Sequence, residues 1–405
     1  MSAARRRIET TSPHLDTGTR SARTRLGDRN PSIECDPRRS SAPLRRSSAD
    51  ERSEAVYRDH GHPQKGETTL HLTHEQQSRA AATLLGTAVG DALGVPYEFA
   101  RRLSPTETPE MIGGGLGNYA PGEWSDDTSM AVAIAEAVAA GHDLTSAAGV
   151  DAVATGFLRW YTDFECSPPD IGIQTRAVLA AAHRRLSEHP DNSISAVMRE
   201  ESLVYAAVHP RSAGNGALMR TAPVALAHLD DRAALAEAAR AVAGLTHSDA
   251  LAGDSCVLWC EAIRVAILEA RIDITAALDL VPHARRDEWA GFLDDAATQY
   301  PSSFSPNGYT VRALQAAASA ILHTPQNDHH FVDSLFTAVR IGDDTDTVAA
   351  IAGGLLGARW GMEAIPPHYR QAVHGWPFTA GVATTEQTLC HLAATGSGFT
   401  FGLND

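Results

Sequence analysis

The pattern of apolar and polar positions along the chain changes near residue 72. From there on, apolar side chains recur at the spacing of one helix face, first at Leu84, Leu85, Ala88 and Leu93. Runs in which β-branched residues alternate with polar ones are absent from the pattern. The sequence therefore predicts a single large all-α domain whose loops carry the chemistry. The further helical runs lie near residues 129–140, 146–161, 173–187, 193–207, 214–228, 231–243, 249–269, 311–322 and 347–360.

Two local signals refine the first predicted helix. Thr73 and Gln76 stand three residues apart, as in a capping box that opens a helix. Glycine then recurs at every fourth position, at Gly86, Gly90 and Gly94. Each glycine inside a helix costs roughly 1 kcal/mol relative to alanine. Their recurrence predicts that another backbone packs closely against this helix.

The composition divides the chain into three parts. Residues 1–70 are rich in Arg, Ser, Pro and Asp and show no apolar periodicity. Such a segment buries too little apolar surface to offset its chain entropy, so we expect a disordered basic leader. Residues 71–385 form the predicted domain, and residues 386–405 form a short tail. The arginines at 5–7 precede no apolar core, so a secretory or twin-arginine signal is not supported.

The net charge of −15 is unevenly distributed. Residues 1–66 carry 14 basic and 9 acidic side chains, whereas residues 67–405 carry 20 and 40. An acidic domain argues against nucleic acid as its main partner, because phosphate contacts need a Lys/Arg surface, and it favours metal cations instead. The only lysine, Lys65, lies in the leader. A Schiff-base lysine and a Walker-type phosphate loop are therefore excluded from the domain.

Cysteine usage and hydropathy indicate the compartment. The five cysteines are an odd number and include no Cys-x-x-Cys pair, which is typical of the reducing cytoplasm. No apolar stretch reaches the roughly 18 residues that a membrane helix needs. We therefore expect a cytoplasmic protein with no membrane partner.

Two acidic clusters stand immediately before apolar, alanine-rich runs. The first is Ser-Asp-Asp-Thr at residues 125–128, and the second is Gly-Asp-Asp-Thr-Asp-Thr at residues 342–347. Asp, Ser and Thr in this place are ordinary helix N-caps. Clusters of oxygen ligands also suit hard divalent cations such as Mg²⁺ or Mn²⁺. The second cluster holds more oxygen-bearing side chains than one cap needs, but spacing alone leaves both interpretations open.

Several loops add candidate binding groups. Glycines at 113–117 lead into the first acidic cluster, and backbone N–H groups in such a loop can approach a phosphate closely. A glycine-flanked helix start at residues 212–220 is a possible anion site. Thr-His-Ser-Asp at 246–249 caps the next helix, and the loop at 305–309 ends in an aromatic residue that can stack on a base. Taken singly, each loop has an ordinary structural explanation.

Taken together, these motifs resemble the ADP-ribosylglycohydrolase family. The resemblance covers roughly residues 75–375 and rests on five motifs in order. These are Gly-Asp-Ala-Leu-Gly at 90–94, the two acidic clusters, Asn-Gly-Ala-Leu-Met-Arg at 215–220 and Thr-His at 246–247. The resemblance implies an all-α enzyme that uses two divalent cations, Mg²⁺ or Mn²⁺, to release ADP-ribose from modified side chains.

The resemblance also implies roles for individual residues. Glu98 is implicated near the catalytic metal, as a general base or a gate. Asp170 matches a carboxylate important in the arginine-directed branch, although this chain continues with Ile173 and Gln174 where that branch commonly has Asn after the Gly. Asp343 has no assigned role. The implied metal ligands, among which Asp127 is also expected to be catalytic, are Ser125, Asp126, Asp127, Asp344, Asp346 and Thr347.

The expected substrate is an ADP-ribosylated protein, with arginine as the favoured acceptor. The pyrophosphate is expected to rest on the glycine-rich loops, and the residues expected to bind substrate are Gly115, Gly214, Asn215, Gly216, His247 and Tyr309. Two alternatives remain at this point. One is a hydrolase of the same fold acting on another ADP-ribosyl linkage, such as serine, a small molecule or nucleic acid. The other is a non-catalytic ADP-ribose-binding protein.

Overall fold

The computed structural model describes residues 71–399 as a helical assembly with one short hairpin. The prediction of an all-α fold is confirmed. The helices are α1 (His74–Gly94), α2 (Asp126–Ala139), α3 (Ala147–Asp163), α4 (Ile173–Glu188), α5 (Ile194–Val208), α6 (Ala222–Ala227), α7 (Arg232–Ala243), α8 (Ala250–Glu269), α9 (His283–Thr298), α10 (Thr310–Leu322), α11 (His330–Arg340), α12 (Thr345–Trp360), α13 (Pro367–Ala372) and α14 (Glu386–Gly396); the strands are β1 (His374–Thr379) and β2 (Val382–Thr385).

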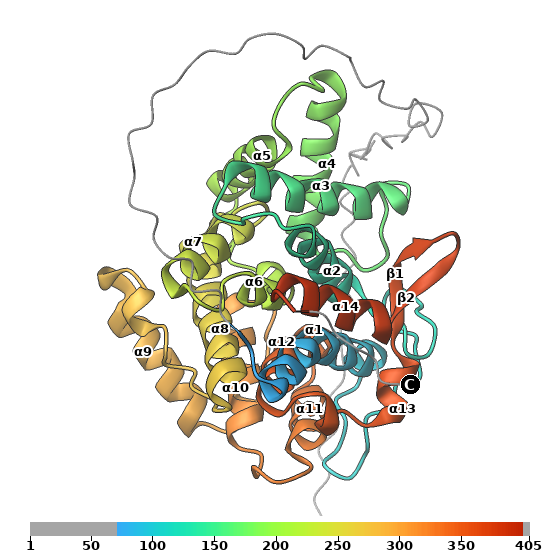
Figure 1. Cartoon of the computed structure of the whole chain (residues 1–405), viewed down its shortest axis with the longest axis vertical. Helices are drawn as coiled ribbons and strands as arrows, with labels where there is room; N and C mark the ends of the chain where they lie inside the picture. The colour runs from blue at the N-terminus through green and yellow to red at the C-terminus, as the bar shows by residue number, and fades with distance from the viewer. Residues whose placement is uncertain (1–70, 400–405) are drawn as a thin grey trace, which may run out of the picture. The chain divides into compact units, whose positions relative to one another are not determined.

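Helices α1 and α12 form the buried centre of this assembly (Figure 1). A Cβ atom added at Gly90 would lie 2.0 Å from the carbonyl oxygen of Ala349, and one added at Gly86 would lie 2.2 Å from that of Gly353. Gly353 and Gly357 leave matching room from the α12 side. The backbones therefore meet directly, as the recurring glycines of α1 predict. This contact also sets the distance between the residues that the two helices carry.

Gly90→Ala is expected to lower the free energy of unfolding by about 2 kcal/mol, because the new methyl group forces α1 and α12 apart. Gly291, in α9, is the matched control, because a Cβ atom there meets no heavy atom within 4 Å. Gly291→Ala is expected to raise the free energy of unfolding by about 1 kcal/mol through helix propensity alone. Urea unfolding of both variants measures the two shifts, and shifts of the same sign would contradict this account of the contact.

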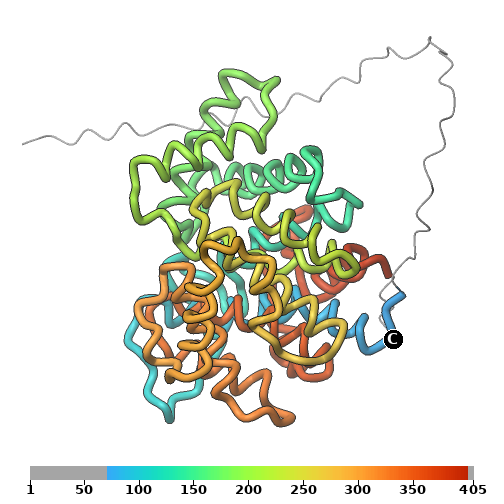
Figure 2. The backbone as a smooth tube through the Cα atoms, turned by 90° about the vertical axis from the view of Figure 1, so that its left-hand side faces the viewer, coloured from blue at the N-terminus to red at the C-terminus, as the bar shows by residue number. Residues whose placement is uncertain are grey.

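The remaining helices surround the central pair. Helix α2 packs on α1 and on α14, while α8, α10 and α11 pack on α12. In both orientations α3, α4 and α5 lie at one end of the described part, and α9, α10 and α11 lie toward the other (Figure 2). The loops before α6, α10 and α12 meet one another, because Asn215 and Asn307 both form hydrogen bonds with Asp344.

Local signals explain several of the helix starts. The capping box at Thr73 and Gln76 is present, and Asp249 caps α8 by accepting from Leu251 N. The helical run predicted at 214–228 is instead split into a short 3₁₀ turn, η2 (Asn215–Ala217), and α6. Its first half therefore forms a loop that is hydrogen-bonded to the segment before α10.

The structure departs from the sequence prediction at α9 and α11, which lie outside the predicted helical runs, and near the C-terminus. Residues 374–385 form an antiparallel hairpin, which the sequence pattern did not predict. Helix α14 follows it, beyond the domain boundary expected at residue 385, and Leu389 and Cys390 are buried within the core. The sequence predicts a tail after residue 385 because the segment has few apolar residues. In the structure, however, α14 packs against α1 and α2. The predicted leader, residues 1–70, lies outside the described residues.

Within residues 71–399, no helix combines the length and the apolar character needed to cross a membrane.

Candidate functional site

The two acidic clusters each open a helix, as predicted. Ser125 is the N-cap of α2 and accepts from Asp127 N, so that Asp126 and Asp127 occupy its first turn. Asp344 is the N-cap of α12 but accepts no backbone N–H of that helix with its side chain. Asp346 lies in the first turn of α12. The carboxylate of Asp344 is thus free of the capping role and faces the loops around it.

The fold joins the clusters into two groups of three carboxylates that share Asp346. Asp91, Asp127 and Asp346 form one group, and Glu98, Asp344 and Asp346 form the other. Within each group one oxygen from every residue lies within 4.8 Å of the others. Three separate segments supply these residues: α1 with the turn that follows it, the start of α2 and the start of α12. Such spacing is that of ligands around a cation, and the shared carboxylate places the two groups side by side.

Asp91 was not among the residues predicted for the site. One of its carboxylate oxygens accepts from Ser125 N at 3.0 Å, and the other accepts from Thr128 N at 2.9 Å and the Thr128 hydroxyl at 2.6 Å. Asp91 therefore fastens the start of α2, with Asp127 on it, to α1. A signal was available, because a carboxylate in the middle of a buried apolar helix is costly unless it has a specific task.

Glu98 and Asp170 approach the same centre from two loops. Glu98 follows the 3₁₀ turn η1 (Val95–Tyr97), and Asp170 lies between α3 and α4. The two carboxyl groups lie close to each other, and each has one buried oxygen without a hydrogen-bond partner. Burial, the charge of Asp346 and the nearby carboxyl group of Asp170 raise the pKa of Glu98 to about 12. In the absence of cations the Glu98 carboxyl group therefore keeps its proton at neutral pH.

The electrostatics of the cluster fit divalent cations. Burial, followed by the charges of neighbouring carboxylates, raises the pKa of Asp126, Asp127 and Asp346 well above the usual range. Among residues 71–399 no arginine forms an ion pair with these groups or with Asp91 and Asp344, and one oxygen of Asp127 is buried without a hydrogen-bond partner. So much buried negative charge requires compensation. Oxygen ligands of this kind match Mg²⁺ or Mn²⁺.

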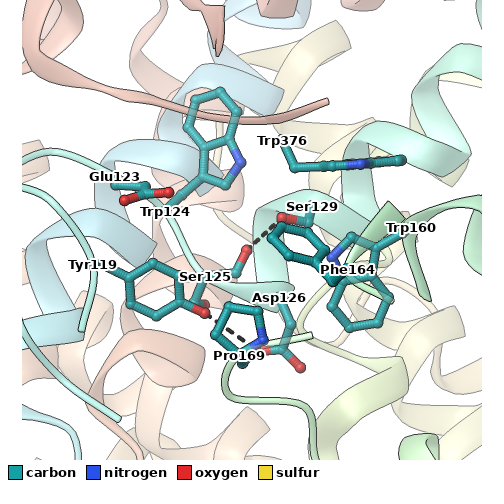
Figure 3. A pocket seen from close by; sticks show the side chains of 10 residues that line it. All are labelled: Tyr119, Glu123, Trp124, Ser125, Asp126, Ser129, Trp160, Phe164, Pro169 and Trp376. Carbon is teal, nitrogen blue, oxygen red and sulfur yellow. Dashed lines mark hydrogen bonds between the residues drawn. The ribbon is translucent and has the colours of Figure 1, made fainter. Parts of the chain in front are cut away.

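The other predicted ligands lie beside these groups. The Ser125 hydroxyl donates to Asp127 at 3.0 Å, and the Thr347 hydroxyl is close enough to Asp127 and Asp344 to offset part of the rise in their pKa. Asp126 belongs to neither group of three. Its carboxyl group lines a pocket that Figure 3 shows together with the aromatic side chains of Tyr119, Trp124, Trp160, Phe164 and Trp376.

The predicted substrate loops meet at Asp344. Asn215 donates to Asp344 at 2.8 Å, and Gly214 pairs with Tyr309 in an isolated antiparallel bridge. Asn307, which was not predicted, ties the same loops together: its side chain accepts from Asp344 N at 3.0 Å and donates to Gly342 O at 3.1 Å. A fully buried asparagine beside a cis Ser305–Pro306 bond gives no sequence pattern by which to find it.

The remaining predicted residues lie at the edges of the cluster. The imidazole of His247 stands against Gly216 and Gly214, where an added Cβ atom would lie 3.3 Å from Nε2 in either case. Gly115 packs on Val95, three residues before Glu98, and it has a φ of 62° that favours glycine. Tyr119, at the end of that glycine-rich loop, donates to Pro169 O beside Asp170. The predicted residues therefore belong to one region of the fold.

Comparison with known proteins gives the family. A model of the ADP-ribosylglycohydrolase family matches residues 72–396, which includes α14. ADP-ribosylarginine hydrolase Tri1 of Pseudomonas putida is 31% identical over 310 residues, covering 75% of this chain and 76% of that protein. The glycohydrolase of Rhodospirillum rubrum named for ADP-ribosyl-dinitrogen reductase is 29% identical over 293 residues, covering 71% and 87%.

A solved structure agrees with these matches. A chain described as an ADP-ribosylglycohydrolase-related protein complex superposes with a TM-score of 0.58 at 28% identity, covering 80% of this chain and 99% of that one. The paired acidic clusters and the glycine-rich loops thus stand in a fold already associated with this chemistry. The chain belongs to the ADP-ribosylglycohydrolase family and is an enzyme that hydrolyses ADP-ribosyl bonds.

Proposed function

We propose that this enzyme releases ADP-ribose from arginine side chains of modified proteins and that it uses two divalent cations, Mg²⁺ or Mn²⁺. The observation that carries the proposal is the pair of carboxylate groups that share Asp346, placed beside the loop of Gly214 and Asn215. The ligands we assign are Asp127, Asp344 and Asp346, assisted by Ser125, Asp126 and Thr347. When bound, the cations supply electrophilic charge at the ribose and make water more acidic.

The assignment of arginine as the acceptor rests on the carboxyl group of Asp170, which lies beside the carboxylate cluster. The turn between α3 and α4 carries Asp170, and one oxygen of the Asp170 carboxyl group is buried without a hydrogen-bond partner. A guanidinium group pairs with carboxylates. The name of the Pseudomonas putida relative, an ADP-ribosylarginine hydrolase, supports the same acceptor.

We assign each residue of the site a separate role in the reaction. Cleavage of the bond at the anomeric carbon develops positive charge on the ribose, and the carboxylates around the site favour that charge. Glu98 holds or removes a proton near the reacting carbon, since its carboxyl group belongs to the second carboxylate group and its raised pKa lets it carry a proton. Asp170 pairs with the leaving guanidinium, and the loop at Gly214–Gly216 receives the pyrophosphate oxygens.

A panel of ADP-ribosyl peptides linked through arginine, serine or threonine tests the proposal. We expect release of ADP-ribose from the arginine-linked peptide only, in Mg²⁺ or Mn²⁺, and none after treatment with a chelator. Mass spectrometry of the released peptide identifies the bond that is broken. Release from serine- or threonine-linked peptides alone would assign another linkage, and ADP-ribose binding without release from any peptide would leave a non-catalytic binding protein.

A further inference from the structure

Arg220 is a buried cation that forms no ion pair with any described carboxylate, although the charge of the buried Asp126 acts on it. It lies between η2 and α6, and its side chain is 0% exposed. One guanidinium nitrogen donates to Met130 Sδ at 3.2 Å, and the guanidinium carbon lies 4.3 Å from the ring centre of Phe157. Its strongest polar contact is a 2.6 Å hydrogen bond to the hydroxyl of Thr246.

This contact fixes the direction of the next hydrogen bond. A guanidinium group only donates, so the Thr246 oxygen accepts from Arg220. The Thr246 hydroxyl is fully buried, and its other contact is with His247 Nδ1 at 2.8 Å. If Nδ1 also donated to Thr246, the hydroxyl proton would be buried without an acceptor, which is costly. Thr246 therefore donates to Nδ1, and Nδ1 carries no proton.

The proton of His247 must then reside on Nε2, the nitrogen that faces Gly214 and Gly216. Burial, together with the charge of Arg220, lowers the pKa of His247 to about 3, so the ring stays neutral across the physiological range. Gln174 fixes the backbone at Thr246, because its side-chain amide donates to Thr246 O at 2.9 Å. The result is one N–H group of fixed direction aimed at the glycine loop.

We propose that Arg220 and Thr246 are positioning residues that hold His247 in its Nε2–H tautomer, so that Nε2–H donates to an oxygen of the ADP-ribosyl group on the loop at Gly214–Gly216. This inference rests on the proposed function for the identity of the ligand, but its structural half stands independently. The guanidinium group donates to the hydroxyl, the hydroxyl donates to the imidazole, and the imidazole donates to the substrate oxygen. This order follows from the hydrogen-bonding capacity of each group.

The test uses the full chain with ¹⁵N-labelled histidine. Long-range ¹H–¹⁵N spectra distinguish a protonated from an unprotonated ring nitrogen, and the signals of His247 are assigned by their loss in His247→Gln. We expect an unprotonated Nδ1 and a protonated Nε2, unchanged between about pH 6 and pH 8. Thr246→Ser keeps the hydroxyl and should keep this pattern. Thr246→Val removes it and should populate the Nδ1–H tautomer.

Binding of ADP-ribose provides the second readout. Thr246→Val is expected to weaken the affinity for free ADP-ribose about tenfold, measured by titration calorimetry, whereas Thr246→Ser restores it. Thr221→Val is the matched control, because Thr221 is equally buried near Arg220 but contacts Cys260 instead of His247. Its affinity should equal that of the wild type.

Each outcome decides the inference. An Nδ1–H tautomer in the wild type overturns it, and this spectrum requires no variant to fold. Wild-type tautomer and affinity in Thr246→Val also overturn it. If the wild type shows the Nε2–H tautomer but binds no ADP-ribose, the proposed function fails, while the role of Arg220 and Thr246 in setting the tautomer is upheld.

Discussion

Asp127→Asn and Asp344→Asn are each expected to lower kcat by on the order of 10³-fold while leaving the helical fold intact. Each change removes one carboxylate charge from a different one of the two groups and preserves the size of the side chain. Because the carboxylates repel one another when no cation is bound, the variants should be no less stable than the metal-free wild type. Circular dichroism and release of ADP-ribose measure the two effects.

Asp343→Asn is the matched control for these variants. Asp343 stands next to Asp344, but it belongs to neither carboxylate group, and its carboxyl group accepts from Ser305 instead. Its φ of 61° is one that asparagine tolerates well. We expect activity within about threefold of the wild type, since replacing a carboxylate that is not a metal ligand by an amide of the same size changes the free energy little. A loss equal to that of Asp344→Asn would show that charge anywhere in the loop matters, which contradicts the assigned ligands.

Removal of divalent cations is expected to destabilise the protein strongly at neutral pH. A cation present at 1,000 times its dissociation constant stabilises the folded state by about 4 kcal/mol per site. Without cations the buried carboxylates keep their raised pKa values; burial raises that of Asp91 to about 6. A raised folded pKa means that the folded state binds protons more tightly than the unfolded chain, so stability is highest at low pH and is lost as the pH rises.

The pH dependence should therefore invert on adding metal. For the chelated protein, we expect the free energy of unfolding to fall as the pH rises from about 4 to 6, by about 3 kcal/mol for Asp91 alone. Glu98, with a pKa near 12, extends the loss above neutral pH. With saturating Mn²⁺ the stability should instead rise over this range, since cations compete with protons. Urea unfolding at a series of pH values tests this, and parallel curves with and without Mn²⁺ would contradict a metal site.

Periodicity and caps are local, so the sequence predicts most of the helices that carry them, although α11, whose apolar residues share one face, was missed. The capping box at Thr73, the cap at Asp249 and the close packing at Gly90 are all confirmed. Helix α9 has only a few apolar residues among charged ones, and α14 is short, so neither produces a clear pattern. The hairpin at 374–385 contains Pro377 and a register shift, which hide the alternation that identifies a strand.

Residue patterns alone point to the site only where its chemistry is concentrated in sequence, whereas the isolated Glu98 and Asp170 were proposed from the family resemblance. The clusters containing Asp127 and Asp346 stand out because one cap needs fewer oxygens than they supply. Asp91 and Asn307 act through partners that lie 34 to 37 residues away along the chain, and single-sequence patterns do not encode such pairs. The division of the carboxylates into two groups sharing Asp346 likewise depends on the distance between α1 and α12.

The amount of metal bound per chain tests the central claim most directly. Native mass spectrometry of the full chain in Mn²⁺ should show two ions per wild-type chain and a single ion at most for Asp127→Asn. Asp346→Asn, which alters both groups at once, should retain none, and ADP-ribose release from an arginine-linked peptide should follow the same order. A wild-type chain that releases ADP-ribose with no bound divalent cation, or an Asp346→Asn variant that keeps both ions, would contradict the account.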